Sequence, residues 1–159
     1  MTNTELAKEF LELRNLLIIG GYDQRRVAHY ARLASTLLRL PIPIEALCQE
    51  GRLCEIPGVG SALAGTISEY ILSGTCRRRL EWERRVPKSL LKLLEIPGVG
   101  VQTVRYLYQQ CGIESLEALE GAVRQGTLRP MNARIATRLR THFSRMPQDK
   151  QATLALFGD

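Results

Sequence analysis

Apolar side chains recur every three or four positions along most of the chain, which is the spacing of one face of an α-helix. No segment shows a sustained two-residue alternation, so β-strands are not expected. We therefore predict an all-α fold. The stripes that carry this prediction are Leu6, Phe10, Leu13 and Leu17; Val27, Ala31, Ala34 and Leu38; Leu63, Ile67, Tyr70 and Ile71; Val104, Leu107 and Tyr108; and Met131, Ile135, Leu139 and Phe143.

Capping and breaking residues set the limits of several of these helices. Asp23 is a predicted N-cap for the second helix, and Pro41 and Pro43 end it. A short helix is expected over Ile44–Cys48, and another over Ser115–Val123, with the serine as its cap.

One eight-residue pattern occurs twice, forty residues apart. Leu53–Gly60 reads LCEIPGVG and Leu93–Gly100 reads LLEIPGVG, and each copy precedes one of the helical stripes. Pro-Gly-Val-Gly makes a tight turn in which glycine tolerates positive φ and lets another backbone come close. The helix that follows begins with unpaired amides at the positive end of its dipole. Such an end binds a phosphate oxygen without a charged side chain. The candidate phosphate-binding residues are Gly58, Gly60 and Ser61, and Gly98, Gly100 and Val101.

Two other interpretations of the repeat are weaker. A nucleotide-binding glycine loop would need a third glycine and a preceding strand, and neither is present. A bend that serves only packing would explain a single Gly-x-Gly. Two identical hexamers, each after a leucine and before an amphipathic helix, favour DNA-backbone binding instead.

The charge of the chain supports a polyanionic partner. The chain holds 22 Lys and Arg against 16 Asp and Glu, for a net charge of +6, and all but four of the basic residues are arginine. Arginine forms bidentate contacts with phosphate. Basic runs occupy Arg25, His29, Arg32 and Arg39; Arg134, Arg138, His142 and Arg145; and Arg77, Arg78, Arg79, Arg84 and Arg85 in the connector Thr75–Lys88. The candidate DNA contacts are Arg25, Arg26, Arg32, Arg78, Arg105, Arg134 and Arg138.

Other classes of function find little support. The four cysteines form no CxxC pair, so a zinc site is not expected, and free thiols suit a reducing compartment. The two histidines are interpreted as surface groups. The start, MTNTELAKEF, is not a signal peptide, and no apolar run approaches membrane length. We expect a cytoplasmic protein without a membrane partner.

The order of these elements resembles the N-terminal part of family X DNA polymerases. A helical segment, an Ile-Pro-Gly-Val-Gly hairpin, a connector and a second such hairpin follow one another over residues 5–147. The supporting segments are Tyr30–Ala34, Ile67–Ile71, Ser73 and Gly74, Gly112–Leu119 and Arg145–Pro147. The resemblance implies a lyase-like domain at 1–80, a second helix-hairpin-helix subdomain at 86–147 and a tail at 148–159.

The resemblance also implies a function and a cation. It implies binding of gapped, nicked or 5′-phosphorylated DNA in repair or replication, with Arg25 and Arg26 at phosphate-pocket positions. In the family, hairpin carbonyls coordinate a monovalent cation that bridges to DNA phosphate. The matching carbonyls for Na⁺ or K⁺ are those of Cys54, Ile56 and Val59, and of Leu94, Ile96 and Val99.

Two departures from the family bear on catalysis. The chain stops where the polymerase palm would begin, and it contains no Gly-Ser and Asp-x-Asp arrangement for two-metal nucleotidyl transfer. The family's Schiff-base lysine falls on Thr66, and a phosphate-binding lysine falls on Ala62. Because amine catalysis needs a lysine, we expect DNA binding without lyase activity.

Two alternatives stay open. The first is a 5′-deoxyribose-phosphate or abasic-site lyase that uses Lys88 or Lys92. The second is an interaction scaffold for a separate polymerase core or repair protein, for which apolar residues of the tail (Leu154, Leu156 and Phe157) are the sequence hint.

Overall fold

The computed structural model describes residues 1–128 and 132–146, and within these ranges every regular element is helical. The all-α prediction is therefore confirmed. Predictions that concern Met131, Pro147 and the tail fall outside the described residues. The elements are α1 (Asn3–Ile19), η1 (Gln24–Val27), α2 (Ala28–Arg39), α3 (Ile44–Gln49), η2 (Leu53–Glu55), α4 (Ser61–Ser73), α5 (Arg77–Glu83), η3 (Lys88–Glu95), α6 (Val101–Cys111), α7 (Leu116–Gln125) and α8 (Ala133–Arg145).

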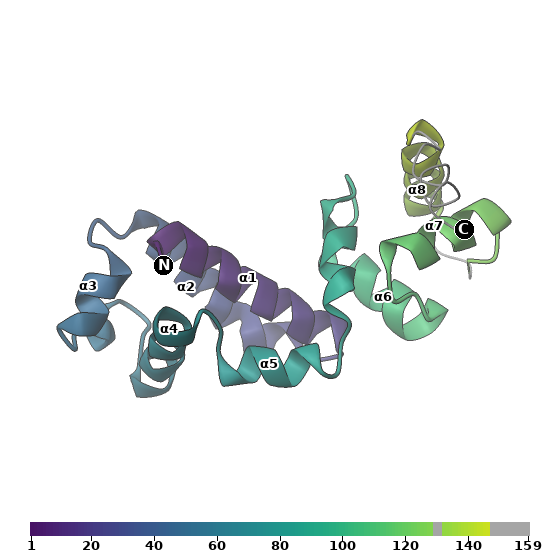
Figure 1. Cartoon of the computed structure of the whole chain (residues 1–159). Coiled ribbons are helices and arrows are strands. Elements are labelled where there is room, and N and C mark those ends of the chain that lie inside the picture. The colour runs from purple at the N-terminus through teal and green to yellow at the C-terminus, as the bar shows by residue number, and fades with distance from the viewer. Residues whose placement is uncertain (129–131, 147–159) are drawn as a thin grey trace, which may run out of the picture.

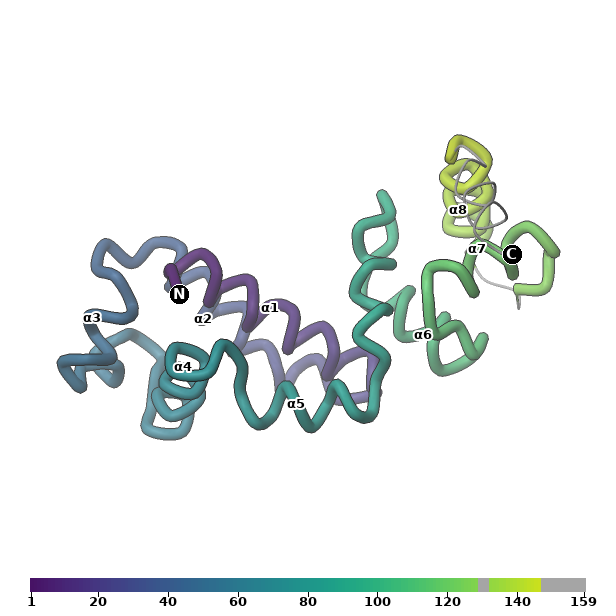
Figure 2. The backbone as a smooth tube through the Cα atoms, in the orientation of Figure 1, coloured from purple at the N-terminus to yellow at the C-terminus, as the bar shows by residue number. Residues whose placement is uncertain are grey.

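The long helix α1 is the axis of the molecule. Helix α2 packs along α1, and α5 lies beside it (Figure 1). Helices α3 and α4 lie toward the N-terminal end of α1, whereas α6, α7 and α8 lie beyond its other end. Figure 2 shows the backbone running from α5 through η3 into α6, away from α3 and α4.

Local signals set most helix limits as expected. The Ser115 hydroxyl accepts the Ala118 amide and caps α7, and α2 ends at Arg39 before the two prolines. Asp23 is also a cap, but the turn it caps is the 3-10 helix η1, and α2 begins only at Ala28.

The predicted apolar stripe of α2 was partly wrong. Leu38 is 57% exposed, whereas Tyr30, Leu33 and Leu37 are buried together with Val27 and Ala34. The face of α2 that packs on α1 is centred on Tyr30, Leu33 and Leu37, to one side of the predicted stripe. Tyr30 stacks on Phe10 of α1 with ring centroids 5.7 Å apart, so the aromatic residue faces the core.

The buried residues form two clusters. The first collects apolar side chains between Leu6 and Cys76, and the second collects those between Val86 and Phe143. Two residues of α1, Leu16 and Ile19, belong to the second cluster although they lie far earlier in the chain. The first helix therefore contributes to the core of both halves, so the two helical subdomains share an element.

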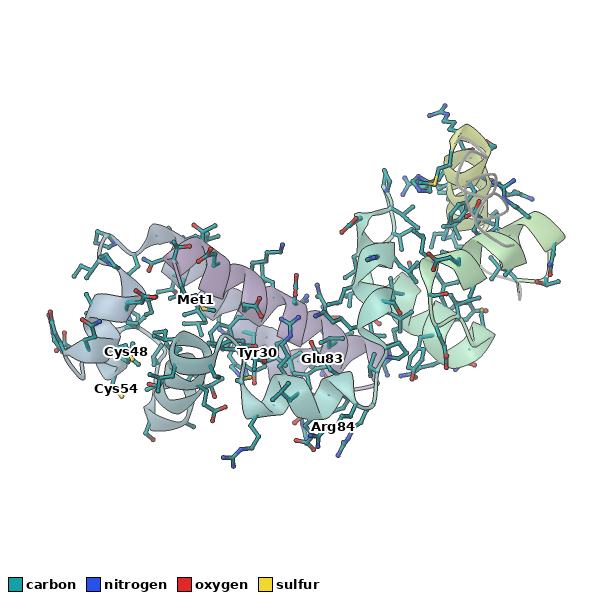
Figure 3. The ribbon with its side chains drawn as sticks, viewed as in Figure 1. Met1, Tyr30, Cys48, Cys54, Glu83 and Arg84 are labelled. Atoms are coloured by element: carbon teal, nitrogen blue, oxygen red, sulfur yellow. The ribbon has the colours of Figure 1, made fainter. Side chains whose placement is uncertain are left out.

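The connector contains a helix whose basic run is partly structural. Arg79 of α5 is only 5% exposed, and its guanidinium binds Glu9 and Glu12 of α1 and Glu83 of α5. Glu83 lies on the α1 side of α5, whereas Arg84 lies on the outer side (Figure 3). The interpretation of Arg79 as part of a DNA-facing run is wrong, because its guanidinium is buried and forms ion pairs with three carboxylates of the fold.

Polar contacts reinforce the junction between the halves. The Gln109 side chain donates to the Ile19 carbonyl at 2.9 Å, and the Gln102 amide donates to Gln24 at 2.6 Å. Gly20 lies so close to Trp82 that a methyl group in place of its hydrogen would overlap the indole.

Candidate nucleic-acid interface

The two hairpins have nearly the same backbone geometry. Gly58 has φ +82° and Gly98 has φ +80°, the left-handed region that glycine adopts without strain. The helix-capping glycines Gly60 and Gly100 are extended, with φ of −93° and −96°. Within each turn, an amide of the Val donates to the Ile carbonyl three residues earlier at 3.0 Å. The sequence repeat is therefore a structural repeat.

Each hairpin buries its isoleucine and its valine and exposes its glycines. Val59 and Val99 are each only 6% exposed, whereas all four glycines of the two turns are exposed. Because the cap is glycine, no side chain accepts the first amides of α4 or α6. The intrahelical ladder begins with the Ala64 amide on Gly60 and the Val104 amide on Gly100. The amides before these donors are free of intrahelical partners.

The predicted arginines lie on five helical elements. Arg25 and Arg26 are exposed in η1, ahead of α2 and not on its face as the basic run suggested. Arg32, on α2, and Arg78, on α5, lie near His29. Arg134 and Arg138 are exposed on α8, and Arg105 is half-buried on α6.

A pocket of about 440 Å³ lies beside Thr66, between α4 and α5. The Arg78 guanidinium stands 5.4 Å from the ring centre of Tyr22 and 5.8 Å from that of Tyr30. The Thr66 hydroxyl donates back to the Ala62 carbonyl at 3.2 Å. Sequence reasoning missed Tyr22 and Trp82, which line this pocket, because no local pattern places an aromatic ring from the α1–η1 turn against α5.

His29 is half-buried and not a free surface group. Its ring centre lies 4.1 Å from that of Tyr30. Burial lowers the pKa of His29, and the positive charges of Arg78 and Arg32 lower it further. The prediction that His29 is a surface group is corrected by this packing, whereas His142 of α8 lies beside the second hairpin.

A second pocket, of about 500 Å³, separates the second hairpin from α8. Its wall includes Pro97 and Gly98 of the hairpin, and Arg138 and His142 of the helix. An added Cβ at Gly98 would overlap the Arg138 guanidinium, whereas nothing lies near the matching position at Gly58. The two hairpins thus share a backbone but differ in what covers them.

The described residues hold no group of three or more His, Cys, Asp or Glu side chains placed to bind a metal ion. The four cysteines are free thiols, of which Cys54 is exposed in η2 and Cys76 is buried. Over the same ranges, the search for a helix of bilayer-spanning length and hydropathy found none.

Comparison with known proteins defines the class. The profile of the helix-hairpin-helix domain matches residues 1–76, and that of the SAM-like helix-hairpin-helix tandem matches residues 90–139. The two matches agree with the paired hairpins, so the chain contains two helix-hairpin-helix units, which is an arrangement that supports DNA binding.

The particular resemblance is to a family X polymerase. An aligned stretch of 80 residues is 29% identical to the DNA polymerase/3′-5′ exonuclease PolX of Bacillus subtilis (strain 168). This stretch is 50% of the present chain and 14% of the relative, so the chain spans a small part of that protein's length. The predicted resemblance to the helix-hairpin-helix region of family X polymerases is confirmed.

Proposed function

We propose that the chain binds DNA through backbone phosphates without reading sequence, and that it acts on gapped, nicked or 5′-phosphorylated DNA in repair or replication. The observation that carries this proposal is the pair of hairpins with the same backbone geometry and exposed glycines, each followed by a helix whose glycine N-cap provides no side-chain hydrogen bond. Two such turns would bind two stretches of the DNA backbone through amide contacts with phosphate, which do not depend on the base sequence.

The test is fluorescence anisotropy with gapped, 5′-phosphorylated DNA and with intact duplex at two salt concentrations. We expect affinity to fall steeply with salt, with little sequence preference. Replacing Gly60 or Gly100 with valine places a branched side chain where a phosphate approaches, so each variant should bind about tenfold more weakly. If both variants stay folded and bind as tightly as the parent chain, the proposal is wrong.

The pocket beside Thr66 supports recognition of a 5′-phosphate. Arg77, Arg78 and Arg85 line it together with Glu69 and Glu81, and Arg85 pairs with Glu81. The proposed phosphate contact is therefore Arg78, which is held in place by the faces of two tyrosine rings. Arg25 and Arg26 remain proposed backbone contacts. A 5′-phosphate on gapped DNA should raise affinity, and Arg78→Gln should remove that gain.

The pocket favours binding over lyase chemistry. Its lining has no lysine, and Thr66 supplies a hydroxyl where an amine is needed for a Schiff base. Lys88 and Lys92 lie in η3, on the second-hairpin side. Borohydride trapping on abasic DNA should therefore yield no adduct, and an adduct abolished by changing either lysine would establish the lyase alternative.

Two further parts of the proposal concern partners. We propose that Na⁺ or K⁺ bridges hairpin carbonyls and phosphate at the six positions named above. The Ile56 and Ile96 carbonyls each accept one turn amide, which leaves a second lone pair for a cation.

A scaffold role for a polymerase catalytic domain or repair protein would be supported by a pull-down that survives nuclease.

A further inference from the structure

The pocket between the second hairpin and α8 gathers basic side chains, and none of its described lining residues is acidic. Arg138, His142 and Arg145 line it, together with Pro97, Gly98 and Thr141. No carboxylate lines the pocket, and in the described part of the chain neither of the two arginines forms an ion pair. Four arginines elsewhere in the fold, Arg52, Arg79, Arg85 and Arg124, do pair with a glutamate.

The position of Arg138 ties this charge to the hairpin. Its guanidinium packs against the bare Cα of Gly98, in space that a Cβ would occupy. The hairpin thus brings a rigid backbone surface to one side of the guanidinium and leaves its other donors open to the pocket. At the first hairpin no side chain comes within 4 Å of the matching point on Gly58.

From this arrangement we infer that the second hairpin carries an additional phosphate-binding pocket, formed by side chains of α8, which the first hairpin lacks. Arg138 supplies a planar fork of donors for phosphate oxygens, and Arg145 and His142 complete the wall. Thr141 adds a hydroxyl. The inference deepens the proposed DNA binding and rests on it. The ligand is a phosphate group, either a backbone diester or a terminal monoester.

The experiment compares two arginine variants of the full chain that remove the same charge from the same helix. Arg138→Gln removes the pocket guanidinium, and Arg140→Gln removes an exposed guanidinium that does not line the pocket. Anisotropy is measured across a salt series, and circular dichroism checks that both variants fold. We expect Arg138→Gln to bind about three- to tenfold more weakly and its salt slope to fall by about 0.9, as for one lost phosphate contact. Arg140→Gln should stay within about twofold of the parent chain.

Two DNA substrates distinguish the two sources of phosphate. A duplex closed at both ends by loops has only diesters, whereas the same duplex with one 5′-phosphorylated nick adds a terminal monoester. If Arg138→Gln lowers the affinity for both substrates equally, the bound group is a diester. If it lowers only the affinity for the nicked duplex, the bound group is a monoester. If the Arg138 and Arg140 variants have the same affinities and salt slopes on both substrates, the pocket is not a phosphate site. In that case loss of binding in the Gly60 and Gly100 valine variants would still support the proposed function.

Discussion

At the scale of single residues, the two glycines of each hairpin have different tasks. The first, Gly58 or Gly98, is required by its positive φ, which costs other residues about 1–2 kcal/mol. The second, Gly60 or Gly100, has a φ that any residue adopts. Its value lies in the missing side chain, which leaves the helix amides open. Under the proposed function, the requirement for glycine at the second position is one of binding and not of folding.

This distinction predicts opposite effects of one substitution. A serine at Gly60 or Gly100 should cap the helix and raise the free energy of unfolding by a few tenths of a kcal/mol. The same hydroxyl should occupy an amide that phosphate would bind, so DNA affinity should fall. Thermal denaturation and anisotropy on the same samples measure both. Unchanged affinity in the two serine variants would show that these amides do not contact DNA.

His29 makes stability depend on pH. Because the pKa of His29 in the folded chain lies below its ordinary value of 6.5, the unfolded chain takes up the proton first as pH falls. Stability should be complete above pH 6.5 and decline as pH drops from that value toward the lower folded pKa. Urea denaturation at about pH 7.5 and 5.5 measures the free energy of unfolding at each pH. The difference between the two values should be smaller for His29→Gln than for the parent chain. An equal change in both would assign the effect elsewhere, and His142→Gln is the control.

At the scale of elements, most helices could be predicted because their signals are local. The repeat, the Ser115 cap and the α1 stripe all lie within a few residues of the structure that they specify. Helix α5 and its contacts could not be predicted in this way. The glutamates that bind Arg79 include two from α1, about seventy residues earlier, and only the tertiary fold brings them together. The pocket at Arg138 could not be predicted for the same reason, because α8 and the second hairpin are distant in sequence and are brought together only by the tertiary fold.

Arg79 should therefore stabilise the packing of α5 on α1. Arg79→Met would leave three partly exposed glutamates without their partner, and we expect a loss of about 2–3 kcal/mol. Arg84→Met, on the exposed outer side of the same helix, should change stability by less than about 0.5 kcal/mol. Chemical denaturation followed by circular dichroism compares the two. Equal losses would mean that Arg79 acts only through its charge on the helix.

At the scale of the whole molecule, α1 joins the two halves. Leu16 and Ile19 lie in the second core, Ile18 lies in the first, and Val101 of α6 contacts both. The hairpins thus belong to two core clusters that share α1 and meet at Val101, and not to two independent modules. Sequence patterns predicted two helical units but not this shared helix, because the stripe of α1 does not reveal which partner each apolar residue meets.

Adjacent isoleucines test this coupling. Ile19→Ala should destabilise the chain by about 2–4 kcal/mol and speed amide hydrogen exchange in α6 and α7, although the residue belongs to α1. Ile18→Ala is the matched control, and its effect on exchange should appear mainly in the first half. If α6 and α7 exchange at the parental rate in the Ile19 variant, the halves are not coupled through α1.

The junction also contains the single tryptophan of the chain. Trp82 meets Tyr22 edge to face, with ring centres 5.9 Å apart, and lies under the Arg85 guanidinium and against Gly20. Its intrinsic emission therefore originates at the seam of the molecule and from the lining of the Thr66 pocket. The protein carries a native optical reporter, so that separation of the halves and occupancy of that pocket both change a signal that needs no attached dye.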